Sequence, residues 1–560
     1  MSDSTGDLVS RIYSNFRGVD FRGEEINLVR SPESMNVWKD YRETDSIRTR
    51  PGMALHTAFT GTVYGIFFYK GMMIVHSGTE LYSVQNKAVA LLYSGLNEAV
   101  SDGFVYENIW YFKDGKHYLQ YDGTEIRAVE GYVPTTSIAR KPMGGGTKYE
   151  DVNMLSDRRI NSFLADGGSF DFYLDVMNID TDFKPIVKVN GEAVSNYTVN
   201  YTKGVITFND AAPDAPDTDG QDNVTVEFKK AVPGYRDSIL GCTLLQLFDN
   251  RVFFSGNTDH PNTVWHCSLN DPTYVSDLDY YREGMDEAQI RGMVAGNNAL
   301  WVFREPSDAN TNVFYHTPTI DEEYGKIYPS THSSVTIGCT GRAVNFGDDI
   351  IFFSDRGMEG VSGDITTEQM AAHRSSMVDR KLLSEADYRD MILAEWEGYL
   401  LVFVGDKAYL ADSRGVFTNG NHTEYEWFFW QMEHRITSVR VHEGTLYLGT
   451  ESGVYTLTDA AAPLESWWTT PKDKFKYPHK LKTSNKRGCV AEAAGDITVY
   501  AKTEKTEFEQ IGSYENITDY FVSRIKRKKF KDIQLKFYSQ TRFSLETVTL
   551  ECWVGGYIKR

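Results

Sequence analysis

Residues 399–413 read YLLVFVGDKAYLADS, an apolar strand, a polar turn and a second apolar strand. Residues 72–84 (MMIVHSGTELYSV) and 445–458 (TLYLGTESGVYTLT) repeat this pattern. A small or polar residue that suits a tight turn precedes each copy. Such turns are expected at Gly71, Asn108, Asn250, Asn297, Asp348, Gly398 and Gly444. The repeating unit is therefore a hairpin with further strands of the same sheet.

The distances between these turns predict the architecture. Successive turns lie 37, 142, 47, 51, 50 and 46 residues apart. A period of roughly 40–50 residues with several strands per unit is typical of a β-propeller, whose blades stack around a common axis. We therefore expect an all-β chain with one propeller of six to eight blades, of which seven is the preferred number.

The long second step predicts a domain inserted between blades. It exceeds the other steps by roughly two units, and residues 150–233 account for the excess. Within them, Asn190-Gly191 is a two-residue hairpin signal flanked by alternating apolar and polar residues. Short alternating strands of this kind favour a small Ig-like β-sandwich.

The two ends of the chain differ from the middle. The first 56 residues are polar and irregular, and we expect an extended arm that its neighbours order. The last hundred residues contain cleanly alternating strands and predict a C-terminal β-sandwich or jelly roll. One helix is expected at 376–391. The expected domains are an arm at 1–56, propeller segments at 57–149 and 234–460, an inserted sandwich at 150–233 and a C-terminal sandwich at 461–560.

The cysteines and the apolar runs limit the class of protein. Five cysteines are scattered without a CxxC pair, so a disulfide framework or a zinc site is not expected, and a reducing folding compartment fits better. The first residues, MSDSTGDLVSRIYSN, lack the apolar core of a signal peptide. No apolar run approaches the roughly 20 residues that span a bilayer, so no membrane segment is expected.

Charge is distributed unevenly along the chain. The net charge is −20, but residues 465–560 carry 19 Lys and Arg against 12 Asp and Glu, which is +7. The rest of the chain therefore carries −27. Because binding to a phosphate backbone needs cationic neutralisation, the acidic body is not expected to grip nucleic acid over a broad surface. It can still border nucleic acid as a repelling wall.

Sequence signatures of catalysis and of metal binding are missing. No GxSxG, HExxH or GxxxxGK[ST] motif is present, and Gly144–Lys148 is glycine-rich but has the spacing of a linker. His266 and Cys267 would point to opposite faces of a strand and could not share a metal. The acidic stretch PDTDGQD at 216–222 lacks the spacing of a calcium loop. We expect no enzymatic activity, no catalytic residue, no cofactor and no bound metal.

Two groups of basic residues are candidates for an assembly interface. Arginines of the N-terminal segment suit two-pronged contacts with carboxylates. The run SRIKRKKFKD at 523–532 either forms a solvated sheet edge, where Lys blocks aggregation, or docks an acidic partner. The hypothesised interface residues are Arg17, Arg22, Arg48, Arg50, Arg524, Lys526, Arg527, Lys528 and Lys529.

Several short motifs resemble a known family. The N-terminal segment contains FRGVD at 16–20, SPESMN at 31–36 and RTRPGM at 48–53. An SPE-x-x-N … (K/R)RPG opening before propeller blades resembles the packaged-DNA stabilisation proteins of short-tailed bacteriophages, which form the tail hub or nozzle. Thr49 interrupts the paired basic residues of that pattern. Further similarity lies in RRINSF at 158–163, GQDNV at 220–224, WWTTPKDKF at 467–475 and VGGYIK at 554–559.

The resemblance implies a structural virion protein of a phage tail, assembled in the host cytoplasm. Such a protein forms a homo-oligomeric ring, expected to be a hexamer, below the portal and its adaptor, the head-to-tail connector. It retains the packaged DNA and lets the duplex pass on ejection, beside partners such as a fibre, spike or needle. Two alternatives stay open: a propeller that binds or cleaves glycans, and a distal receptor-binding tail protein. A ring in negative-stain images would favour the hub, and a glycan-binding monomer would favour the propeller lectin or enzyme.

Overall fold

The computed structural model describes residues 6–23, 28–40, 43–308, 311–322, 325–362, 370–419, 422–526 and 529–557. The chain divides into two compact units. One comprises Met1–Val100, Asn310–Val313 and Ser333–Arg560, and the other comprises Ser101–Ala309 and Phe314–His332. No helix in the described ranges is both long enough and apolar enough to cross a membrane.

Seven four-stranded antiparallel sheets are present among the described residues, which confirms the all-β propeller. Four belong to the first unit. The first of these sheets contains β6 (Val63–Tyr69), β7 (Met72–Ser77), β8 (Glu80–Gln85) and β9 (Ala88–Ser94), and the second contains β33 (Ala343–Phe346), β34 (Asp349–Ser354), β35 (Gly357–Ser362) and β36 (Met370–His373). The third contains β37 (Ile392–Trp396), β38 (Tyr399–Val404), β39 (Lys407–Asn419) and β40 (His422–Gln431). The fourth contains β41 (Ser438–His442), β42 (Thr445–Gly449), β43 (Gly453–Thr458) and β5 (Gly52–Ala58).

The other three sheets lie largely in the second unit. Their strands are β10 (Asp102–Tyr106), β11 (Ile109–Lys113), β12 (Tyr118–Tyr121) and β13 (Ile126–Ala128); β23 (Leu244–Phe248), β24 (Arg251–Ser255), β25 (Thr263–His266) and β26 (Tyr280–Arg282); and β27 (Ile290–Gly296), β28 (Ala299–Arg304), β29 (Val313–His316) and β32 (Ser330–His332). A short hairpin of β30 (Thr319–Asp321) and β31 (Gly325–Ile327) precedes β32.

The seven expected turns connect the first two strands of the seven blades. Each contains two consecutive residues with positive φ, for example Asp249 at 49° with Asn250 at 57°, and Glu443 at 48° with Gly444 at 76°. Two positive φ angles match the type I′ turn, whose twist suits a two-residue hairpin. Asn, Asp and Gly recur at these positions because they tolerate this conformation at low cost.

The strand that completes one blade comes from the N-terminal side of the chain. β5 pairs antiparallel with β43, from Gly453 opposite Ala58 to Thr458 opposite Gly52. The chain then passes from β5 directly into the next blade at β6. Residues 52–56, which the sequence placed in an arm, therefore belong to the propeller.

The insertion is a two-sheet sandwich in the second unit. One sheet has the order β15 (Thr147–Lys148), β14 (Thr135–Arg140), β16 (Arg158–Phe163), β22 (Val224–Lys229), β18 (Ile186–Val189) and β19 (Glu192–Val194). The other has the order β17 (Asp171–Tyr173), β21 (Val205–Phe208) and β20 (Tyr197–Asn200). The hairpin expected at Asn190-Gly191 joins β18 to β19. The core between the sheets contains Phe163, Phe172, Ile206, Val226 and Phe228.

The insertion begins earlier than the sequence indicated. β14 pairs with β16 and so belongs to the sandwich, although it precedes residue 150. The chain then returns to the blade β23–β26, where Asn153 is buried. Its amide nitrogen donates to the carbonyls of Tyr132 (2.8 Å) and Thr273 (2.9 Å), and its amide oxygen accepts from the backbone N–H groups of Leu155 and Val275, both at 3.0 Å. The chain therefore enters the sandwich twice, first at β14 and again at β16.

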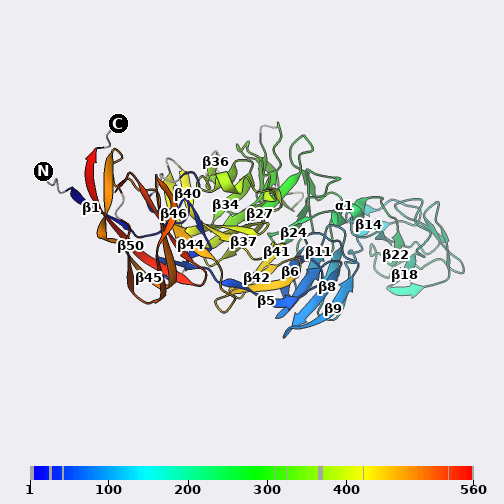
Figure 1. Cartoon of the computed structure of the whole chain (residues 1–560). Coiled ribbons are helices and arrows are strands. Elements are labelled where there is room, and N and C mark those ends of the chain that lie inside the picture. The colour runs from blue at the N-terminus through cyan, green and yellow to red at the C-terminus, as the bar shows by residue number, and fades with distance from the viewer. Residues whose placement is uncertain are drawn as a thin grey trace, which may run out of the picture. The chain divides into compact units, whose positions relative to one another are not determined.

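The N-terminal segment is not an extended arm but part of the C-terminal domain. Its strands β1 (Asp7–Tyr13), β2 (Ser34–Met35), β3 (Val37–Asp40) and β4 (Glu43–Thr49) join an 11-stranded sheet. β1 pairs with β50 (Phe543–Tyr557), and Figure 1 shows both strands near the N-terminus. β4 also pairs with β50, and β2 pairs with β44 (Ser466–Thr469). The Asp473 carboxylate holds β1 by accepting from Arg11 Nε at 2.6 Å and from the Tyr13 hydroxyl at 2.9 Å.

The C-terminal domain is organised by one long strand, β45 (Lys480–Thr503). Its first part pairs with β50 and its last part pairs with β49 (Ile533–Ser539), so the strand passes between two portions of the sheet. A strand that changes sheet in this way builds the corner of a sandwich. The remaining strands on β45 are β46 (Thr506–Ile517), β47 (Tyr520–Ser523) and β48 (Lys529–Phe530).

The helix expected at 376–391 forms only in part. It is reduced to α2 (Asp379–Leu382) and the 3₁₀ turn η1 (Tyr388–Asp390). Met377, Leu382 and Met391 are buried in the core of the blades β33–β36 and β37–β40. The segment therefore packs its apolar side chains against the blades from short turns, and it does not form one continuous amphipathic helix. A further helix among the described residues is α1 (Tyr235–Leu240).

We expect a substitution at Gly453 to open the propeller at β5. Gly453 has φ near +154°, and an added Cβ would lie 2.5 Å from the Thr57 carbonyl oxygen of β5. Gly453→Ala should lower the free energy of unfolding by about 3 kcal/mol, because strain and overpacking act together. Hydrogen–deuterium exchange of residues 52–58 should accelerate.

Gly444→Ala is the matched control for this prediction. Gly444 also has positive φ, at +76°, but no atom lies within 4 Å of an added Cβ. Its cost should be about 1 kcal/mol, from backbone strain alone. Equal effects of the two substitutions, with unchanged exchange at 52–58, would contradict the assigned role of β5.

Candidate functional site

The arginines proposed for assembly surround the joint between the N-terminal segment and the blades. Arg50 lies between β4 and β5, and its side chain has no exposed surface. Nε donates to Asn36 Oδ1 at 3.0 Å and Nη1 to the Pro51 carbonyl at 2.8 Å. Nη2 donates to the Gln431 carbonyl and to Glu433 Oε2, both at 2.7 Å. Arg50 therefore binds this chain itself, which corrects its assignment as a partner-facing residue.

Asn36 is the partner that organises this joint. Its φ is 57°, a conformation that Asn tolerates. The side-chain oxygen accepts from Arg50 and from the backbone N–H of Gln431 at 2.9 Å, while the side-chain nitrogen donates to the Glu465 carbonyl at 2.8 Å. One residue thus ties the N-terminal segment to strand β40 and to the start of the C-terminal domain.

Two further arginines pair with carboxylates close to them. Arg22 makes a two-pronged contact with Asp20, at 2.9 Å from Nε and 2.8 Å from Nη2, and this hydrogen bonding raises the arginine pKa. Arg48 lies 3.2 Å from Asp40 and 3.6 Å from Asp459. Both guanidinium groups are engaged within the chain, which explains why arginines are frequent in this polar segment.

Arg17 lines a small cavity of about 230 Å³ together with Lys39, Arg414 and Glu426. Its Nε lies 3.5 Å from Glu426 Oε1, and 41% of the Arg17 side chain stays exposed. Glu426 is buried, and burial raises its pKa, while Lys39, Arg30 and Arg17 act against that rise. Burial likewise lowers the pKa of Lys39 and of Arg30. The cavity is thus lined by three cations and by two carboxylates, Asp412 and Glu426.

The basic run of the C-terminal domain keeps its described cations in solvent. Arg524, Lys526 and Lys529 are exposed, and the first two border a hollow of about 340 Å³ beside β45 and β46. Ile511, Ile525 and Phe530 form the apolar part of this hollow. Arg527 and Lys528 lie outside the described residues. Of the described residues hypothesised for assembly, these three cations are exposed, and Arg17 is partly exposed.

A charged histidine is a feature that the sequence did not indicate. His373 Nδ1 lies 3.0 Å from Glu359, and Nε2 lies 2.7 Å from Asp379. Burial lowers the histidine pKa, but hydrogen bonds and charges from the two carboxylates outweigh it and raise the pKa to about 10. The Ser375 hydroxyl donates to Asp379 at 2.6 Å. An imidazolium that stays protonated at neutral pH is a poor general base, so the cluster is suited to fixing β36 against β35 and α2.

Metal ligation has no obvious site in the described part of the chain. There, no group of three or more His, Cys, Asp or Glu side chains is arranged to hold an ion. The five cysteines are buried thiols, and burial raises the pKa of Cys242, Cys267, Cys489 and Cys552 to about 12.

Comparisons with known proteins give structural likeness alone. No protein-family model and no curated protein matches the chain. BamB from Moraxella catarrhalis is 10% identical with a TM-score of 0.31, covering 73% of this chain and 97% of its own. The gluconolactonase XC5397 from Xanthomonas campestris is 9% identical with a TM-score of 0.27, covering 76% and 97%. An exo-β-1,3-galactanase from Phanerochaete chrysosporium is 7% identical with a TM-score of 0.19, covering 80% and 95%. Likeness this low transfers no activity.

Replacing Arg50 by lysine should weaken the joint. Lysine keeps the charge but cannot reproduce the fork that reaches Asn36, Gln431 and Glu433 together. Because the site is buried, Arg50→Lys should lower the free energy of unfolding by about 3 kcal/mol in a denaturant titration. Arg48→Lys, at a partly exposed ion pair, should cost less than about 1 kcal/mol. Comparable losses for both variants would contradict the central role of Arg50.

The His373 cluster should make stability depend on pH. The pKa is raised from 6.5 to about 10, so its stabilisation is complete below pH 6.5 and is lost as pH rises toward 10. Relative to His373→Gln, the wild-type chain should lose stability across that interval. Denaturant titrations at pH 6, 8 and 10 measure the difference. A constant difference between the two proteins would show that the imidazolium does not stabilise the fold.

Proposed function

We propose that this chain is a structural component of a short-tailed phage tail, a hub or nozzle that retains packaged DNA and lines part of the ejection channel. The observation that supports the proposal is the position of the motifs that resemble that family. FRGVD, SPESMN and RTRPGM supply Gly18, Ser31, Asn36 and Arg50, and these four residues build the joint of the N-terminal segment.

Gly18 and Ser31 show how closely these motifs fit the blade. Gly18 has φ of +76°, and an added Cβ would lie 1.9 Å from the Trp427 carbonyl oxygen. The Ser31 N–H donates to the Gly18 carbonyl at 2.8 Å, and the Val19 N–H donates to the Trp427 carbonyl at 2.7 Å. These motif residues thus allow the N-terminal segment to pack closely against the backbone of the blade. This use supports a structural protein rather than one whose shared residues serve catalysis.

The charge distribution supports a channel role. A duplex that slides past several Lys or Arg contacts would gain affinity through counterion release and would stall. Like charges in a narrow bore repel the polyanion instead. The −27 of residues 1–464 suits a channel wall, and the exposed cations Arg524, Lys526 and Lys529 suit a protein partner such as the adaptor.

Electron microscopy of the purified protein, alone and with a portal–adaptor complex, tests the assembly. We expect rings, hexameric by the family resemblance, that bind below the adaptor. Arg524→Glu combined with Lys526→Glu should reduce this attachment, whereas Lys203→Glu in a turn of the inserted sandwich should not. A strictly monomeric chain that binds neutral glycans would favour the alternative of a glycan-binding or glycan-cleaving propeller.

Duplex DNA should bind the isolated protein negligibly at physiological salt. The acidic body lacks the cationic surface that releases counterions, so its affinity should fall below the range of about 10⁻⁴–10⁻⁶ M typical of non-specific binding. Fluorescence anisotropy with a labelled duplex between 50 and 200 mM salt measures this. Micromolar, salt-sensitive binding would contradict an acidic channel wall.

A further inference from the structure

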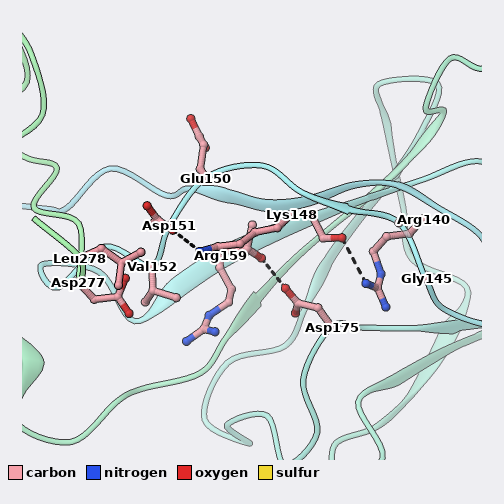
Figure 2. A pocket seen from close by; sticks show the side chains of 13 residues that line it. Arg140, Gly145, Lys148, Glu150, Asp151, Val152, Arg159, Asp175, Asp277 and Leu278 are labelled. Atoms are coloured by element: carbon pink, nitrogen blue, oxygen red, sulfur yellow. Dashed lines mark hydrogen bonds and ion pairs between the residues drawn. The ribbon is translucent and has the colours of Figure 1, made fainter. Parts of the chain in front are cut away.

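A second pocket lies at the base of the inserted sandwich and has no role in the joint. It encloses about 340 Å³ and lies wholly within the second unit. Figure 2 shows side chains of β14, β15 and β16 around it, with Asp277 and Leu278 from the blade β23–β26 closing one side. A volume of this size is within the range of small-molecule sites.

Two buried guanidinium groups line this pocket. Arg140 is 8% exposed and Arg159 is 6% exposed. Arg140 donates from Nη1 to the Ser137 hydroxyl at 3.2 Å and from Nη2 to the Tyr173 carbonyl at 3.0 Å, but its Nε has no partner. Arg159 donates from Nη2 to the Lys230 carbonyl at 3.0 Å. These bonds use few of the ten N–H groups that two guanidinium groups offer.

Within the described part of the chain, neither arginine forms an ion pair. No carboxylate of the described residues lies within 4.0 Å of either guanidinium group, although every arginine of the joint has one. Burial lowers the pKa of both arginines, while the more distant Asp175 acts against this for both, and Asp277 acts against it for Arg159 as well. A buried cation without an anion is destabilising, whereas a bound oxyanion would compensate it. The two guanidinium groups therefore offer hydrogen bonds to an oxyanion in a lining that also contains carboxylates.

The remaining lining groups restrict which oxyanion fits. Asp175 accepts from the Thr136 hydroxyl at 2.7 Å, Lys148 pairs with Asp151 at 2.5 Å, and Glu150 accepts from the Thr135 N–H at 2.5 Å. These carboxylates would repel a doubly charged phosphate. They retain lone pairs that accept hydrogen bonds from hydroxyl groups. The favoured ligand carries one carboxylate and several hydroxyls.

We propose that this pocket binds an acidic sugar of the hexuronate class. Its carboxylate would be held by the guanidinium groups of Arg159 and Arg140, and its hydroxyls would donate to rim carboxylates such as Asp277 and Glu150. The site is independent of the tail-hub role, because it uses only the inserted sandwich and one neighbouring blade.

Calorimetry and ligand-observed NMR with the full chain test this directly, with D-glucuronate as the probe. We expect binding of glucuronate, and at least tenfold weaker binding of glucose, which has the ring and hydroxyls but no carboxylate. Inorganic phosphate and sulfate should also bind at least tenfold more weakly. Tighter binding of phosphate or sulfate would overturn the sugar in favour of an inorganic anion, and equal binding of glucose would overturn the role of the arginines.

Arg159→Met and its neighbour Arg158→Met form a matched pair of variants. Arg158 lies next to Arg159 in β16, but its side chain points to the other face of the sheet, where its Nη1 lies 2.9 Å from Glu227. Arg159→Met should weaken glucuronate binding at least tenfold without lowering the free energy of unfolding, because it removes an uncompensated buried charge. Arg158→Met should leave binding unchanged.

Arg140→Met provides a second variant with the same expected loss of binding. Equal weakening by Arg158→Met, or no glucuronate binding by the wild-type chain at millimolar concentration, would overturn the proposal.

Discussion

The backbone groups along the free edge of a blade need a partner strand. In the last blade of the sequence, β5 is the strand that pairs with the free edge of β43. β5 hydrogen-bonds along β43 and continues directly into β6, so one short segment joins the final blade of the sequence to the first. The N-terminal residues that precede β5 must then leave the blade at a fixed point. Asn36 and Arg50 hold them there, and strands β1–β4 continue into the C-terminal sheet.

The local features of the fold could be predicted from the sequence, because they depend on residues close together in the chain. Positive-φ turns at Gly71, Asn250 and Gly444 follow from residue type, and their spacing follows from the length of a blade. The pairing of the N-terminal segment with the C-terminal sheet could not be predicted in this way. Pairing of β1 with β50 depends on partners hundreds of positions away, and a polar strand such as DLVSRIY resembles a loop until its partner is known.

The same distinction applies to the sites. Residue type identified the arginines of the N-terminal segment, but not that Glu433 and Gln431 would enclose Arg50. His373 acquires its charge from Glu359 on a neighbouring strand and from Asp379 on α2, which the sequence separates. Gly144–Lys148, expected to be a linker, forms one wall of the pocket beside Arg140 because β14 turns back through it to β15. Such sites arise from topology, which composition does not encode.

The pairing of β1 with the C-terminal domain has a consequence for synthesis on the ribosome. Arg11 must bond to Asp473, which lies 462 positions later in the chain. At about 5–20 residues per second, roughly 20 to 90 s pass between the synthesis of these two residues. During that interval the apolar side of β1, including Tyr13, has no partner strand to cover it. The nascent chain must therefore keep its first strands soluble and unpaired until translation is almost complete, which exposes them to chaperones and to neighbouring nascent chains.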